Sequence, residues 1–355
     1  MESLLILIAS VGIGVGCILY LFRHLDWSYK RYVIIATVLI TCVGYFGVQR
    51  ANRADTEIWN GEVTSKTSEH VLCDHSYSCN CRTDSKGIQT CDTCFEHGYD
   101  VDWIVRHTAG DPIVIDRVDR QGLLTPSRWE QVRIGEPVAQ RHTFINYIKA
   151  AEASLFNTEA ERKAFAQYEK QIPKYPAAIY DYYHLDRVVT LGQFKLSNSL
   201  RKEWNTVLAN DLRPLGPKKK VNVVMVFTDS QDPNIAQAVR VAWKGGKKND
   251  VIVVLGTPHY PEVSWAKVFS WSDNESFKIE LADELVDRKT VAPAETLAVI
   301  SQGIAKGYKY KSMEEFSYLA WESTPSAIAC LLIAALAFVA AFVLCRIFST
   351  HPRFR

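Results

Sequence analysis

A cluster of cysteines between positions 73 and 94 has the spacing of a metal site. Cys79 and Cys81 form C-x-C, and after nine intervening residues Cys91 and Cys94 form C-x-x-C. Four thiolates on two tight turns can hold Zn²⁺ tetrahedrally, so this spacing predicts a structural zinc site. Three neighbouring residues are alternate ligands: Cys73, His75 and His97.

Disulfides are the alternative for the same cysteines, and an oxidising, extracytoplasmic location would favour them. An odd number of clustered cysteines cannot all pair, so disulfides would leave one thiol over. Zinc and disulfides both remain open from the spacing alone. Either would staple a loop that lacks a core of its own, and we expect no catalytic role for the cluster.

Three aspartates are the candidate catalytic residues. Asp229 and Asp232 follow an apolar run, and Asp250 precedes another. Carboxylates beyond the carboxyl end of a strand can bind a divalent cation, or one can act as nucleophile in phosphate hydrolysis. The alternative is structural: Asp229 and Ser230 cap a helix, and Asp250 is a turn residue.

The elements around these aspartates predict a strand, a helix and a strand. Val221–Phe227 is rich in β-branched residues, and Asp232-Pro233 opens an amphipathic helix that Gly245-Gly246 ends. Val251–Leu255 is a second apolar run. Two apolar runs around a helix predict a βαβ unit whose parallel sheet is covered on both faces.

The same stretch resembles the TPM domain. The resemblance rests on Trp243-Lys244-Gly245-Gly246, on Asp250 before VIVVLG, and on the later helix Ala294–Gly307. It covers Val221–Tyr310 and departs from the family where Asn249-Asp250-Val251 replaces the usual Asp-Gly. The resemblance implies a membrane-anchored, extracytoplasmic α/β sandwich with an accessory role, and phosphatase activity has been suggested for some members.

Three apolar runs predict membrane-spanning helices. Leu4–Phe22, Tyr32–Val48 and Ala327–Cys345 contain no charged residue, and each approaches the roughly 20 residues that cross a bilayer core. Because their centres carry no Asp, Glu, Lys or Arg, they indicate an anchor rather than a transporter. The chain carries 41 Lys and Arg against 39 Asp and Glu, a balance that does not point to nucleic acid.

Basic residues predict the orientation of the three helices. The link between the first two contains Arg23, Lys30 and Arg31, and the tail contains three more: Arg346, Arg353 and Arg355. Basic residues in short segments favour the cytoplasm. The N-terminus and the region between the second and third helices are then expected on the extracytoplasmic side.

The predicted fold class is an α+β membrane protein with a small β-rich module and a TPM-like α/β sandwich. The expected divisions are two helices in 1–48, a β-rich cysteine module in 56–150, a helical connector with a Pro/Lys linker in 151–220, the α/β domain in 221–322, a transmembrane helix in 325–348 and a basic tail in 349–355. Strands are expected within the module at Ile58–Val63, Val101–Arg106, Ile113–Val118 and Arg128–Ile134.

These features predict a membrane-tethered accessory protein that engages another membrane or envelope protein, with structural zinc or no cofactor. The alternative is a metal-dependent, phosphatase-like hydrolase that uses Asp229, Asp232 and Asp250. The chain contains no P-loop, G-x-S-x-G, H-E-x-x-H or dinucleotide-binding motif, which favours the first hypothesis.

Overall fold

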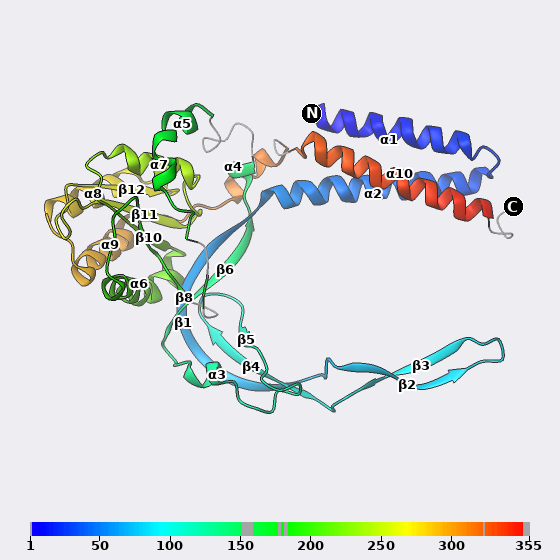
Figure 1. The fold of residues 1–355 in the computed structure, drawn as a ribbon, viewed down its shortest axis with the longest axis horizontal. Helices are drawn as coiled ribbons and strands as arrows, with labels where there is room; N and C mark the ends of the chain where they lie inside the picture. The colour runs from blue at the N-terminus through cyan, green and yellow to red at the C-terminus, as the bar shows by residue number, and fades with distance from the viewer. Residues whose placement is uncertain (1, 151–158, 177–178, 181–183, 322–323, 351–355) are drawn as a thin grey trace. The chain divides into compact units, whose positions relative to one another are not determined.

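The structure, a computed structural model, describes residues 2–150, 159–176, 179–180, 184–321 and 324–350. It divides into two compact units (Figure 1). The helical unit comprises 1–55, 143–158 and 312–355, and the α/β unit comprises 56–142 and 159–311.

The helical unit contains three helices that are long and apolar enough to cross a membrane: α1 (Glu2–Leu21), α2 (Trp27–Arg53) and α10 (Ala327–Thr350). Apart from Ile333, the buried side chains of α10 are small, namely Cys330, Ala334, Ala337, Ala341 and Cys345. Small residues allow helix backbones to approach closely, and α1 and α2 both pack against α10.

Two short helices complete this unit, α4 (Tyr147–Ala150) and the 3₁₀ helix η2 (Glu314–Trp321). Gln49 and Arg53, near the end of α2, both donate hydrogen bonds to the carbonyl of Ala320 in η2. The chain therefore leaves α2 and returns towards α10 at the same end of the helical unit.

The first sheet of the α/β unit has the order β5 (Ile113–Ile115), β4 (Asp100–His107), β1 (Ala54–Val71) and β6 (Pro137–Ile145). Its buried side chains include Val63, Trp103 and Val105. The strand expected at Arg128–Ile134 is wrong. Residues Ser127–Gln131 instead form the short helix α3, whose Trp129 packs edge-on against Trp103 at 4.7 Å between ring centroids.

Between β1 and β4 the chain forms a two-stranded ribbon of β2 (Ser76–Thr83) and β3 (Gln89–Phe95), drawn in cyan in Figure 1. Nearly all of its side chains are exposed. A hairpin without a buried face is marginal in water, so the ribbon needs another source of stability.

The second sheet has the order β12 (Trp265–Ser270), β11 (Asp250–Gly256), β10 (Asn222–Thr228) and β9 (Val188–Thr190). β9, β10 and β11 are parallel, and β12 is antiparallel at the edge. The predicted βαβ unit is confirmed as β10, α7 (Asn234–Ala242) and β11.

Helices cover both faces of this sheet. Alternate strand residues such as Met225 and Val253 pack with α6 (Asn198–Lys219), α8 (Glu275–Asp287) and α9 (Pro293–Gly307). The intervening residues pack with α7 and Trp243. Two covered faces explain why β10 and β11 are apolar without alternation. The remaining described elements are short: α5 (Glu159–Ala164), η1 (Ala166–Gln171), β7 (Ile179–Tyr180) and β8 (His184–Leu185).

The Pro/Lys linker expected before residue 221 is instead the end of α6, which runs to Lys219 despite Pro214 and Pro217. Leu212 is buried in the core, and Gly216 packs so closely on the backbone of Asn60 that a Cβ there would lie 2.1 Å from its carbonyl oxygen. Tertiary packing therefore holds as helix a sequence whose composition is typical of a loop.

Buried polar side chains connect the two sheets. The guanidinium of Arg187 donates to the side-chain oxygens of Asn60 in β1 and Asn222 in β10. Asn249 donates to the carbonyl of Ile58 at 2.7 Å. The β-rich module and the α/β domain therefore form one unit rather than two loosely linked domains.

Candidate functional site

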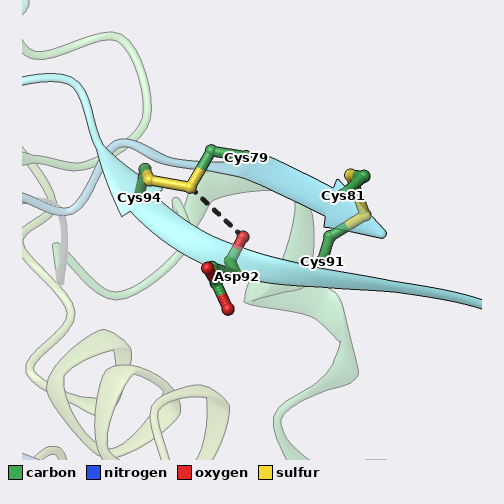
Figure 2. Close-up of a disulfide and its surroundings, with 5 residues drawn as sticks. All are labelled: Cys79, Cys81, Cys91, Asp92 and Cys94. Carbon is green, nitrogen blue, oxygen red and sulfur yellow. Dashed lines mark hydrogen bonds between the residues drawn. A yellow bond between two sulfur atoms is a disulfide. The ribbon is translucent and has the colours of Figure 1, made fainter. Parts of the chain in front are cut away.

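The four cysteines predicted as zinc ligands are paired in two disulfides across the ribbon, Cys79–Cys94 and Cys81–Cys91 (Figure 2). Their thiolates are therefore not available for a tetrathiolate zinc site, and the disulfide alternative describes them. Cys79 Sγ lies 3.5 Å from the carbonyl oxygen of Asp92, which is a contact rather than a hydrogen bond because a disulfide sulfur carries no proton.

The fifth cysteine, Cys73, lies with the two histidines that the sequence indicated as alternate ligands. Cys73 follows β1, His75 precedes β2, His97 follows β3 and Asp100 begins β4. Their four ligand atoms all lie within 4.8 Å of one another, so this group could hold a metal ion. We name it the junction cluster, because it lies where the ribbon leaves the first sheet.

The side chains of the junction cluster are aimed at one another. Cys73 Sγ lies 3.8 Å from Nδ1 of His75 and 3.7 Å from Nδ1 of His97. The Asp100 carboxylate lies 3.0 Å from His97 Nδ1 and 3.2 Å from His75 Nδ1. The Asp100 side chain is fully buried, and the two histidines are about one fifth exposed.

Asp100 is held in place from outside the cluster. Arg117 donates to its Oδ2 at 2.9 Å, and the backbone N–H of Asp74 donates at 3.1 Å. Burial opposes ionisation of Asp100, but hydrogen bonds from Asp74, His97 and Cys73, with the charge of Arg117, outweigh burial and hold its pKa well below the usual range. Asp100 is thus a carboxylate.

The sequence did not indicate Asp100, because it directly precedes the strand expected at Val101–Arg106 and lies outside the cysteine spacing. Only the antiparallel pairing of β1 with β4, which aligns Val71 with Asp100, brings it beside Cys73. The signal that was present in the sequence is the cysteine and histidine at positions 73 and 75.

The three candidate catalytic aspartates are not brought together. Asp229 follows β10, whereas Asp250 pairs with Asn222 at the start of that parallel strand. Seven residues at about 3.3 Å each place Asp229 and Asp250 more than roughly 20 Å apart, at opposite ends of the parallel strands. They cannot form one active site.

Asp232 and Asp250 have structural partners. Asp232 accepts hydrogen bonds from Tyr168 and from the backbone N–H of Asn234 at the start of α7, and these lower its pKa. It is therefore Asp232, not Asp229, that accepts from the start of this helix. Asp229 itself is exposed.

Asp250 is fully buried and accepts hydrogen bonds from Tyr175, from Asn222 and from the backbone N–H of Lys247. Burial outweighs these interactions and raises the pKa of Asp250 to about 6. The turn role expected for Asp250 therefore includes tying the start of β11 to its neighbours.

A cleft of about 750 Å³ lies between β6 and α6, and sequence reasoning did not predict it. Its lining includes Asn60, Arg187, Arg201, Asn205 and Asn210. The Arg187 guanidinium is already engaged with Asn60 and Asn222. The cleft is large enough for a small ligand, but the Arg187 hydrogen bonds to Asn60 and Asn222 are structural and do not identify a catalytic group.

Comparisons with family models, with curated proteins and with solved structures found no match. The resemblance of 221–310 to the TPM domain therefore stays a prediction.

Proposed function

We propose that this chain is a membrane-tethered interaction protein whose α/β unit lies on the extracytoplasmic side and engages another membrane or envelope protein through the β2–β3 ribbon. The observation that carries the proposal is the ribbon itself: an exposed hairpin, stabilised by two disulfides rather than by a core. The two disulfides hold the exposed ribbon in one conformation, although it has no buried core to stabilise it.

The exposed apolar side chains of the ribbon support a binding role. Tyr77, Ile88 and Phe95 are each more than half exposed. Tyr77 and Phe95 lie at the base of the ribbon and point to opposite faces, because they pair with Cys94 and Ser76, and Ile88 lies in the turn. The ribbon therefore offers an apolar side chain to a partner on each face and at its tip. Preordering by disulfides lowers the entropy lost when such a surface binds.

The disulfides also support the location. Disulfides persist in oxidising compartments and are rare in the cytosol. The basic link between α1 and α2 independently favours the cytoplasm for the opposite end of the helical unit. Three helices of sufficient length and hydropathy would supply the tether. The resemblance of 221–310 to the TPM domain implies the same placement.

Photocrosslinking from the ribbon tests the proposal. A photoreactive residue replaces Ile88, which is 61% exposed in the turn, and the control replaces Ile279, which is 60% exposed on α8. In native membranes we expect the Ile88 site, and not the Ile279 site, to yield one adduct with a membrane or envelope protein. The adduct should disappear when Tyr77 and Phe95 are both replaced by Ser. Equal labelling from both sites, or no adduct from Ile88, would contradict the proposal.

A further inference from the structure

The junction cluster takes one side chain from each of four strand ends. Cys73 and Asp100 lie at the ends of β1 and β4, whereas His75 and His97 lie at the ends of β2 and β3. The two disulfides link β2 to β3 within the ribbon and do not reach the first sheet. The cluster is thus where the ribbon could be fixed to that sheet.

The ligand atoms of Cys73 and Asp100 lie at nearly tetrahedral distances from the two histidines. Bond lengths of about 2.3 Å to sulfur and 2.05 Å to nitrogen or oxygen give about 3.6 Å between S and N and about 3.3 Å between N and O in a tetrahedron. The corresponding distances here are 3.8 and 3.7 Å from Cys73 Sγ to the two histidines, 3.0 Å from Asp100 Oδ1 to His97 and 3.2 Å from Asp100 Oδ2 to His75. These four distances agree to within a few tenths of an ångström, and the whole group of ligand atoms lies within 4.8 Å.

The donor set selects the metal class. A thiolate and two imidazole nitrogens are poor ligands for Ca²⁺ and Mg²⁺ and good ligands for Zn²⁺. The charges also balance, because one thiolate and the Asp100 carboxylate neutralise a divalent cation. Asp74 and Arg117 orient the carboxylate, as partners outside the ligand shell do in established zinc sites.

We propose that Cys73, His75, His97 and Asp100 bind one structural Zn²⁺ that fixes the ribbon to the first sheet. Four protein ligands complete the tetrahedron, so the ion has no open position for a substrate. Zinc also keeps Cys73, the odd cysteine of the cluster, from exchanging with the neighbouring disulfides. The site does not depend on the ribbon binding a partner.

Zinc content of the full chain, purified in detergent without reductant or chelator and incubated with equimolar Zn²⁺, tests the proposal. We expect one zinc per chain in the wild type. Cys73→Ser should weaken zinc affinity by at least about 100-fold, the upper end of what loss of an outer-shell partner causes. Matched controls are His70→Gln, a histidine of β1 outside the cluster, and Cys42→Ser, a cysteine of α2; both should keep the zinc.

Removal of the Cys79–Cys94 disulfide distinguishes this zinc site from a zinc site built on the four ribbon cysteines. Cys79→Ser with Cys94→Ser should leave zinc stoichiometry unchanged, and its loss would overturn the proposal. A readout that needs no variant is Co²⁺ substitution in the wild type. Tetrahedral d–d bands with a thiolate charge-transfer band are expected, and their absence, or a wild type without zinc, would also overturn the proposal.

Discussion

Burial of Asp250 gives the α/β unit a pH-dependent stability. The pKa of this carboxyl is about 6 in the folded chain, against 3.8 for an ordinary aspartate. Between these values the folded state holds a proton that the unfolded state has lost, so the stabilisation is complete below pH 3.8 and is lost as pH rises through 6. The difference of roughly two pH units corresponds to about 3 kcal/mol.

Asp250→Asn is the matching variant, because it keeps the size and cannot ionise. We expect its stability to lack the fall between pH 4 and pH 6 that Asp250 contributes in the wild type. Amide exchange in β10 and β11 of the detergent-solubilised chain measures this difference. Parallel pH profiles for the two proteins would show that Asp250 does not titrate in this range.

At the scale of residues, the sequence predicted which side chains carry chemistry better than it predicted their partners. Asp232 was rightly placed at the start of a helix, but its bond with Tyr168 joins residues far apart in the chain. Asp250 was identified as a residue before a strand, yet its burial follows from Tyr175 and Asn222. Spacing reports local geometry, and these partners are set by the tertiary fold.

At the scale of elements, the ribbon depends on its cross-links. The Cys79–Cys94 disulfide, which closes the longer loop, spans 15 residues, and a stabilisation of about 3 kcal/mol is typical for that loop length. Replacing all four ribbon cysteines by Ala should therefore raise amide exchange in β2 and β3 by about 100-fold. Amide exchange in β10 and β11 should not change, since these strands belong to the second sheet and have their own hydrophobic core. An equal increase in both sheets would contradict a locally stabilised ribbon.

The packing of α1 against α10 depends on Gly14. A Cβ at this position would lie 2.2 Å from the ring of Phe338, whereas a Cβ at Gly12 would meet no atom within 4 Å. Gly14→Leu should therefore destabilise the helical unit by about 1–3 kcal/mol, as overpacking does elsewhere. Gly12→Leu is the control on the same helix and should leave the thermal midpoint in detergent unchanged. Equal midpoints for the two variants would show that α1 does not pack this closely.

Apolar periodicity predicted the elements that bury a full face and was less successful where packing overrides local preference. β10, α7 and β11 were predicted because continuous β-branched runs flank an amphipathic helix. The end of α6 was mistaken for a linker because Pro214 and Pro217 are read as helix breakers, yet the packing of Gly216 on Asn60 keeps that segment helical.

At the scale of the whole molecule, an odd number of crossings determines which segments share a side. The contacts of Gln49 and Arg53 with Ala320 place the exit from α2 and the return towards α10 at one end of the helical unit. If the three helices span the membrane, the α/β unit lies on one side, and the link after α1 lies with the end of α10 on the other. The disulfides favour the oxidising side for the α/β unit.

Cysteine labelling of intact cells with a membrane-impermeant maleimide tests this topology. Three exposed positions are suitable: Glu280 on α8, His24 in the link and Thr350 at the end of α10. We expect Glu280→Cys to be labelled directly, and His24→Cys and Thr350→Cys only after permeabilisation, each above the background of the native cysteines. The reverse pattern would place the ribbon disulfides in the cytosol, where reduction opposes them. It would thereby contradict the extracytoplasmic proposal while leaving the zinc site, which needs only a reduced Cys73, intact.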